Sequence, residues 1–152
     1  MRSVDVDVWP FPLDGRDLMQ SVLAGYAGAD VRFSVSRSGT VGLLAVTRGR
    51  AVGVDVERIE PRRALGPIAD QLFAADEAAE LRALPEETRV ARFYALWTRK
   101  EAYAKALGTG LAVPLGRLRP AYGWSVHDLP LGSEYAGAVC VRGWRARVRL
   151  LA

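Results

Sequence analysis

The sequence predicts one α+β domain, with a mainly antiparallel sheet and helices packed on one face. Segments typical of strands occur early and again late in the chain, and helical segments separate the two groups. That order is typical of the α+β class. The 152 residues, half of them apolar, fit a single domain, residues 1–152, with a sizeable core.

The first part of the chain is expected to hold four strands and one short helix. Residues 4–9 alternate polar and apolar side chains, which predicts a strand that Pro10 and Pro12 end. Residues 17–26 have helical spacing and lead into glycines. Three further strands are predicted over residues 31–36, 41–47 and 51–57.

The second part is expected to begin with helices and to end with strands. An interrupted helical stretch covers residues 67–84. The longest helix is predicted over residues 85–107, because Pro85 opens it, acids occupy its first turn and Gly108 follows it. Four strands are then expected over residues 111–118, 123–127, 134–142 and 144–150.

Composition excludes several classes of protein. No apolar run approaches the ~20 residues that span a bilayer, so no membrane association is expected. The early acids indicate a first strand and not a signal peptide. Cys140 is the only cysteine and lies in an apolar run, so we expect a small buried side chain and no disulfide. A cytoplasmic protein fits these features.

Almost all of the basic residues are arginines. A net charge of +4 permits a polyanionic partner, but the arginines are spread along the chain without a basic helix, so nucleic acid is not expected. Lys100 and Lys105 are the only lysines. Either chance placed them together, or this segment needs a compact ammonium that can exchange its proton.

Two acids share one face of a predicted strand. In residues 52–57 the valines alternate with Gly53, Asp55 and Glu57, so both carboxylates point to one side. They lie roughly 7 Å apart by strand geometry. At an effective dielectric near 20 their repulsion is about 2 kcal/mol. This segment alone is compatible with a solvated strand face as well as with a cation site.

The long helix favours the cation site. At about 100° per residue, Glu101 lies about 40° from Trp97, inside an apolar stripe, and Lys105 lies at its rim. A Glu101–Lys105 pair contributes only a few tenths of a kcal/mol, too little to explain a carboxylate on a packing face. A divalent cation shared by Glu101, Asp55 and Glu57 explains all three acids, and oxygen ligands favour Mg²⁺ over zinc.

These residues resemble the signature blocks of a known family. Val52-Gly-Val-Asp-Val-Glu57, followed by Trp97-Thr-Arg-Lys-Glu-Ala-Tyr-Ala-Lys105, is similar to the 4′-phosphopantetheinyl transferases, and the spacing of the blocks also matches. The segments at residues 73–77, 105–111 and 113–115 look like the same family. The resemblance covers residues 31–141 and implies a 4′-phosphopantetheinyl transferase-like fold.

The resemblance implies an activity and its site. The 4′-phosphopantetheine group of coenzyme A would pass to a serine of an acyl- or peptidyl-carrier protein, releasing adenosine 3′,5′-bisphosphate. Asp55, Glu57 and Glu101 would hold Mg²⁺. Glu101, or a metal-bound water beside it, would take the serine proton, and Lys105 would stabilise or protonate the leaving phosphate. The residues expected to bind coenzyme A are Ser36, Arg37, Lys100, Lys105, Gly108 and Gly110.

The chain departs from the family pattern in two places. Ser34 and Arg37 stand where the family has asparagine and a phosphate-binding histidine, and arginine can keep that contact. Residues 1–30 look like the remnant of an N-terminal lobe, which predicts a homo-oligomer, trimer or dimer, that completes the site; a monomer closed by the N-terminal segment is the alternative. A non-catalytic relative that binds coenzyme A or a carrier protein is the alternative function. The carrier, from fatty-acid, polyketide or peptide synthesis, stays open.

Overall fold

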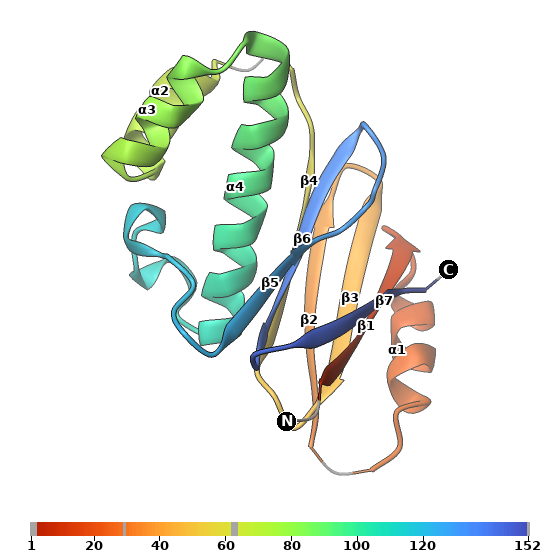
Figure 1. Cartoon of the computed structure of the whole chain (residues 1–152). Helices are drawn as coiled ribbons and strands as arrows, with labels where there is room; N and C mark the ends of the chain where they lie inside the picture. The colour runs from red at the N-terminus through yellow and green to blue at the C-terminus, as the bar shows by residue number, and fades with distance from the viewer. Residues whose placement is uncertain (1–2, 29, 62–63, 152) are drawn as a thin grey trace.

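The computed structural model describes residues 3–28, 30–61 and 64–151 (Figure 1). Its strands are β1 (Val4–Pro12), β2 (Val31–Ser38), β3 (Val41–Arg48), β4 (Val52–Arg58), β5 (Trp124–Asp128), β6 (Tyr135–Arg142) and β7 (Ala146–Leu150). Its helices are α1 (Arg16–Ala24), α2 (Leu65–Leu72), α3 (Ala75–Ala83) and α4 (Glu86–Leu107), with the 3₁₀ turns η1 (Gly110–Ala112) and η2 (Leu115–Arg117). The predicted α+β class is confirmed.

The strands form two sheets. One has the order β2-β3-β1-β7 and the other the order β4-β6-β5. All pairs are antiparallel except β1 with β7. The N-terminal strand is therefore a central strand of the first sheet, between β3 and β7, and the last strand of the chain lies beside it (Figure 1).

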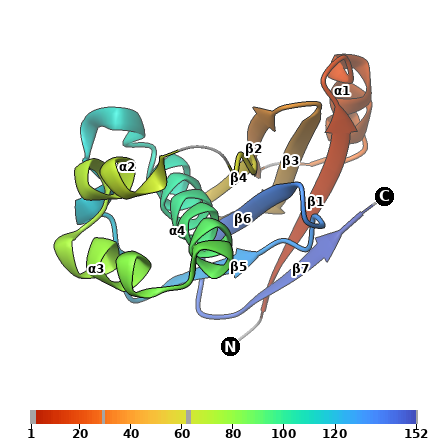
Figure 2. The same cartoon turned by 90° about the horizontal axis from the view of Figure 1, so that it is seen from above.

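The sheets face each other across the main core, and helices cover their outer faces (Figure 2). Helix α4 lies along the outer face of β4-β6-β5, with α2 and α3 beyond it. Helix α1 covers the outer face of the other sheet, where it packs on Phe11, Leu44 and Val46. The inter-sheet core contains buried valines and leucines of β1, β3, β4 and β6, among them Val6, Val8, Leu43, Val54, Val56 and Val139.

Two predicted elements differ from the structure. Strand β1 continues through Pro10 to Pro12, because β7 pairs with β1 only up to Val8 and leaves one side of β1 open beyond it. Proline is tolerated where its missing N–H would face such an open side. The strand expected over residues 111–118 is wrong: this segment forms η1 and η2, and Lys100 Nζ, not a neighbouring strand, binds the carbonyl oxygens of Leu115 and Leu118.

Helix α4 has the ends that its sequence predicts. Pro85 precedes it with extended backbone, and Gly108 ends it in the left-handed conformation, with a φ of 73°. Glycine adopts that conformation without the strain that a side chain brings. None of the described helices is long and apolar enough to cross a membrane.

Candidate active site

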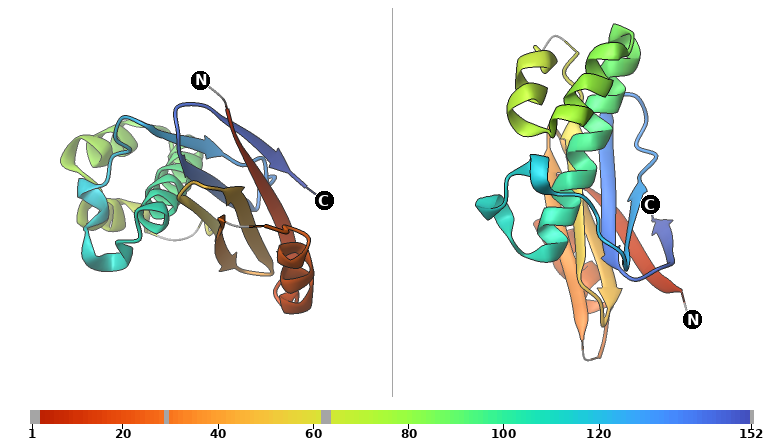
Figure 3. Two further views of the ribbon diagram at one scale, coloured as in Figure 1. Left: turned by 90° about the horizontal axis from the view of Figure 1, so that it is seen from below. Right: turned by 60° about the vertical axis from the view of Figure 1, so that its left-hand side comes forward.

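Strands β2 and β4 lie side by side at the junction of the two sheets (Figure 3). Serine hydroxyls on β2 join them, because Ser34, Ser36 and Ser38 accept hydrogen bonds from the backbone N–H groups of β4. The three donors are Val54 at 3.1 Å, Val56 at 3.1 Å and Arg58 at 2.9 Å. These bonds hold the side chains of both strands in a fixed relative register.

Alternation along β4 separates its core side chains from its polar ones. Val52, Val54 and Val56 belong to the inter-sheet core. Gly53 lies on the opposite face, where a Cβ would collide with backbone atoms of Ala102 and Ala106 in α4. Glycine therefore lets α4 approach β4 closely, which brings the helix side chains to the acids that follow on the same face of the strand.

Asp55 is the centre of the resulting cluster. Its carboxylate is buried, with 4% of the residue exposed. Its Oδ1 accepts hydrogen bonds from Ser36 Oγ and from Lys105 Nζ, each at 3.0 Å. Lys105 Nζ also donates to the carbonyl oxygen of Val54 at 3.0 Å. The aspartate of β4 and the lysine of α4 thus form an ion pair at the contact of strand and helix.

Glu57 and Glu101 complete the acidic group. Glu57 is half-buried and accepts a 3.4 Å hydrogen bond from Ser38 Oγ. Glu101 lies one helical turn before Lys105 and is also half-buried. Its charge acts on both neighbours, since it contributes to raising the pKa of Asp55 and that of Glu57. The fold thus gathers the three predicted acids and Lys105 in one place.

Burial makes Asp55 and Glu57 hold protons more strongly than ordinary carboxylates do. Loss of hydration raises the pKa of Asp55 from 3.8 to about 6, although Lys105 and the Ser36 hydroxyl pull it down. For Glu57, burial and then the charge of Asp55 raise the pKa from 4.5 to about 7. Crowded buried acids of this kind are more common at functional sites than on structural surfaces.

The cluster has the chemistry of a hard-cation site. Asp55 Oδ2 is buried and has no hydrogen-bond partner among the described residues, so one carboxylate oxygen is left for another ligand. The acids of the cluster offer carboxylate oxygens as ligand atoms, which suits Mg²⁺. As the side chains stand, no three acidic, histidine or cysteine side chains of the described segments lie close enough together to hold a metal ion. Mg²⁺ is usually held by one or two carboxylates together with water and substrate phosphates, so a set of three is not required.

Lys100 is not brought to the cluster. It is buried, and its Nζ donates to the carbonyl oxygens of Leu115 at 2.9 Å and Leu118 at 2.7 Å. The third contact of this ammonium is an ion pair with Glu77 at 3.0 Å. These three partners match its three N–H donors. The predicted contact of Lys100 with coenzyme A is therefore not favoured by this geometry, and a role in fixing the loop after α4 is.

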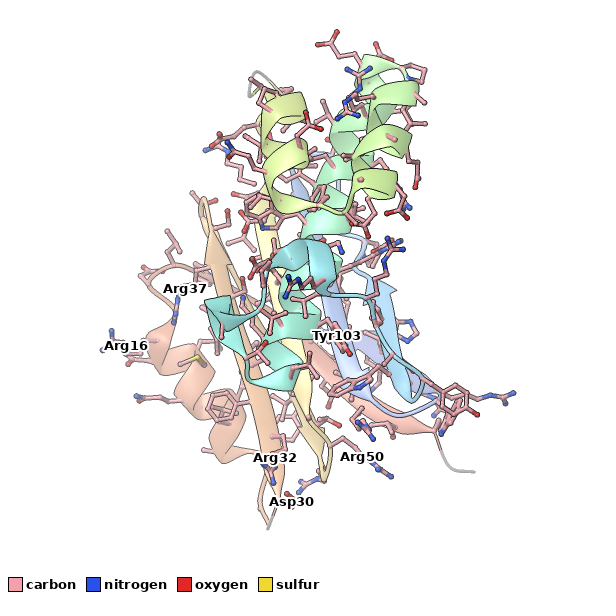
Figure 4. All side chains as sticks on the ribbon, turned by 90° about the vertical axis from the view of Figure 1, so that its left-hand side faces the viewer. Arg16, Asp30, Arg32, Arg37, Arg50 and Tyr103 are labelled. Atoms are coloured by element: carbon pink, nitrogen blue, oxygen red, sulfur yellow. The ribbon has the colours of Figure 1, made fainter. Side chains whose placement is uncertain are left out.

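Arg37 lies on the other face of β2 from Ser36 and Ser38, because neighbouring side chains of a strand point to opposite faces. Its guanidinium carbon lies 5.3 Å from the centre of the Phe11 ring. Figure 4 shows Arg37 beside α1, near Arg16 and away from α4. The side chain is exposed, so it is accessible to a ligand, but it does not point into the acidic cluster.

The two predicted glycines follow α4 directly. Gly108 and Gly110 have φ values of 73° and 55°, and in the described part of the chain no heavy atom beyond the adjacent residues lies within 4 Å of a Cβ placed on either. Their backbone is open to a ligand on that side.

Trp97 packs on Phe93, with ring centres 5.7 Å apart, as expected for a supporting residue. Cys140 is buried, and burial raises the pKa of its thiol to about 12, which agrees with a structural side chain.

Two contributors to the site were not predicted from the sequence. The role of Gly53 in the approach of α4 was not foreseen, nor was that of Ser38, and Ser36 was assigned to coenzyme A alone. The sequence did contain a signal for the serines, since residues 34, 36 and 38 share one face of a strand. His127 is half-buried on β5.

A family model and several known proteins that resemble this chain all carry the same description, 4′-phosphopantetheinyl transferase. A model described as the 4′-phosphopantetheinyl transferase superfamily matches residues 51–140. The 4′-phosphopantetheinyl transferase HetI of Nostoc sp. is 29% identical over 86% of this chain and 70% of its own. AcpT of Salmonella typhimurium is 42% identical over 54% of this chain, and Sfp of Bacillus subtilis is 33% identical over 57%. These alignments span less than half of AcpT and Sfp, 43% and 37%.

Proposed function

The chain belongs to the 4′-phosphopantetheinyl transferase superfamily, and on that premise we propose that it transfers phosphopantetheine from coenzyme A to a carrier-protein serine. The matched residues 51–140 contain β4 and α4, the two elements that carry the cluster. The observation that carries the proposal is the grouping of Asp55, Glu57 and Glu101 with Lys105. Phosphoryl transfer needs this combination of anionic metal ligands and a mobile cation.

In the proposed reaction, the carrier serine Oγ forms a bond to the phosphorus next to pantetheine. The bond from that phosphorus to the bridging oxygen breaks, and adenosine 3′,5′-bisphosphate leaves with the electron pair. Glu101 accepts the serine proton. Lys105, whose side chain is 32% exposed, can turn from Asp55 towards the leaving phosphate and stabilise its charge.

We propose Mg²⁺ as the cofactor, held by Asp55, Glu57 and Glu101. Bound there, it would neutralise the pyrophosphate and help to align it with the serine. The unpartnered Asp55 Oδ2 supports this choice, and the three acids offer carboxylate oxygens as ligands, which favours Mg²⁺ over zinc. Ser36 Oγ and Lys105 occupy Asp55 Oδ1, so the free oxygen is the one available to the ion.

The partners follow from the reaction: coenzyme A and an acyl- or peptidyl-carrier protein. The homo-oligomer expected from the short N-terminal segment stays a prediction. That expectation assumed an uncovered apolar face. The assumption is weakened because β1 is a central strand of the first sheet and α1 packs on Phe11, Leu44 and Val46. Light scattering with and without coenzyme A tests it. A cytoplasmic location also stays a prediction.

Release of the leaving group tests the proposal. The purified chain is incubated with coenzyme A and a panel of apo carrier proteins, with Mg²⁺ in one arm and EDTA in the other. We expect adenosine 3′,5′-bisphosphate in the Mg²⁺ arm only, in proportion to the carrier consumed. Binding of coenzyme A without release, across all carriers, would support the non-catalytic alternative instead.

A further inference from the structure

Each of the three serines on β2 makes a contact that a backbone carbonyl makes in an ordinary ladder. Ser34, Ser36 and Ser38 accept from successive outward N–H groups of β4, at distances between 2.9 and 3.1 Å. The contacts are equivalent in register, since each joins residues 20 positions apart. As far as the attachment of the two strands is concerned, the three hydroxyls are alike.

They differ in what their hydroxyl hydrogens do. Ser36 Oγ donates to Asp55 Oδ1 at 3.0 Å, and Ser38 Oγ donates to Glu57 Oε2 at 3.4 Å. Ser34 has no carboxylate contact among the described residues, although it sits on the same face of β2. A hydroxyl has only one hydrogen, so a serine that gives it to a carboxylate while accepting from a fixed N–H has its orientation determined.

The double contact of Ser36 leaves it poorly placed to touch a cofactor. Only 7% of the residue is exposed, its hydrogen is bound by Asp55, and the N–H of Val56 binds its oxygen. Ser36 Oγ and Lys105 Nζ both bind Asp55 Oδ1, and together they restrict rotation of the Asp55 carboxylate. The opposite oxygen, Oδ2, is then the one left without a partner.

We propose that Ser36, and more weakly Ser38, are positioning residues that aim the carboxylates of Asp55 and Glu57 at the metal, and that Ser36 does not contact coenzyme A. The inference rests on the proposed function, since it assumes that these acids bind Mg²⁺. Hydrogen bonds to metal-ligating side chains typically change metal affinity by about 10–100-fold when they are removed. The shorter, buried bond of Ser36 places it at the upper part of that range, and the 3.4 Å bond of Ser38 places Ser38 at the lower part.

Ser34 supplies a matched control. Ser34→Ala removes a strand contact of the same kind and leaves every carboxylate contact in place. Ser36→Ala removes a strand contact and the bond to Asp55. The difference between the variants therefore isolates the carboxylate bond. Mn²⁺ serves as the probe, with free Mn²⁺ measured by electron paramagnetic resonance on the full chain. Coenzyme A affinity is measured separately in EDTA, and melting temperature checks the fold of each variant.

The expected result is a weaker Mn²⁺ affinity, by about 10–100-fold, in Ser36→Ala, a smaller loss in Ser38→Ala and little change in Ser34→Ala. Coenzyme A affinity in EDTA should be the same in Ser36→Ala and Ser34→Ala. Equal Mn²⁺ losses in Ser34→Ala and Ser36→Ala would overturn the inference, because they would reflect the strand contact alone. So would unchanged Mn²⁺ affinity in Ser36→Ala, or a loss of coenzyme A affinity in EDTA specific to that variant. If Ser36→Ala does not fold, the comparison of Ser38→Ala with Ser34→Ala decides by the same criterion.

Failure of the proposed function has a different signature. A wild-type chain that binds no Mn²⁺ and transfers nothing would contradict the function itself. A wild-type chain that binds Mn²⁺ and transfers, with serine variants that do not follow the expected order, contradicts only the positioning role.

Discussion

Lys105 Nζ lies 3.0 Å from Asp55 Oδ1, so a cation of α4 compensates the most buried carboxylate of β4. The pairing depends on close packing of helix and strand, which Gly53 permits. Because Lys105 is partly exposed while Asp55 is not, the lysine is the member of the pair that can move to a substrate. The contact therefore joins the stability of the fold to the chemistry proposed for it.

Removing one acid should abolish transfer without unfolding the chain. We expect Asp55→Ala and Glu101→Ala to lose Mg²⁺-dependent turnover, because each removes a proposed metal ligand. Folding should survive, since the deletion relieves repulsion among buried acids. Glu87→Ala, on the exposed first turn of α4, is the control and should keep activity. Near-normal turnover in both site variants would show that the metal assignment is wrong.

The metal-free protein should lose stability from this cluster as pH rises. The folded pKa values of Asp55 and Glu57, about 6 and about 7, exceed the ordinary 3.8 and 4.5, so between about pH 4 and pH 7 the folded state holds protons that the unfolded state releases. Stability from these groups is thus greatest below about pH 4 and falls as pH rises through the folded values. For Asp55 the loss is on the order of 3 kcal/mol. Glu57 contributes a smaller loss of stability, because it is more exposed and solvent screens its charge.

Urea unfolding in EDTA at pH 4.5 and pH 7.5 measures this effect. The double variant Asp55→Asn, Glu57→Gln has no charge to develop, so its advantage in unfolding free energy over the wild type should grow with pH. Other titrating groups are common to both proteins and cancel in the difference. A difference that stays constant between the two pH values contradicts the raised pKa values.

Local elements were predictable from the sequence, and contacts between distant segments were not. The alternation of residues 52–57 and the proline and glycine at the ends of α4 set those elements, and the structure confirms them. The division into two sheets depends on β4 pairing with β6, far along the chain. The serine contacts need β2 beside β4, and the burial of Lys100 needs the loop at Leu115–Leu118 to fold over it. No local pattern encodes such proximities.

The close approach at Gly53 gives a prediction for stability. Gly53→Ala places a methyl group against the backbone of Ala102 and Ala106, so α4 must move away from β4. We expect a loss of about 1–3 kcal/mol in unfolding free energy and a fall in activity, because Lys105 moves with the helix. Gly66→Ala is the control: it lies in α2 with open space around its Cβ and should be neutral or stabilising. Equal stability of the two variants would contradict the packing account.

The exposed Arg37 side chain is expected to bind a phosphate of coenzyme A. Its guanidinium is exposed and has no carboxylate partner within the described segments, so it is available to a phosphate. We expect Arg37→Ala to weaken coenzyme A binding by roughly 1.5–3 kcal/mol, the range of a charge-assisted hydrogen bond. With dephospho-coenzyme A the penalty should largely vanish if the 3′-phosphate is the target. Arg32→Ala, on the same strand and paired with Asp30, is the control. An unchanged dissociation constant in Arg37→Ala would exclude the contact.

We expect this chain to attach phosphopantetheine to a carrier serine through the cluster of β4 and α4. Intact-mass and peptide mass spectrometry of an apo carrier protein, after incubation with coenzyme A, Mg²⁺ and either the wild-type chain or Asp55→Ala, measures this directly. The account predicts that the wild type adds the mass of one phosphopantetheine to a single carrier serine and that Asp55→Ala adds none. Carriers that stay at their apo mass with the wild type, or that gain the same mass with both proteins, would contradict it.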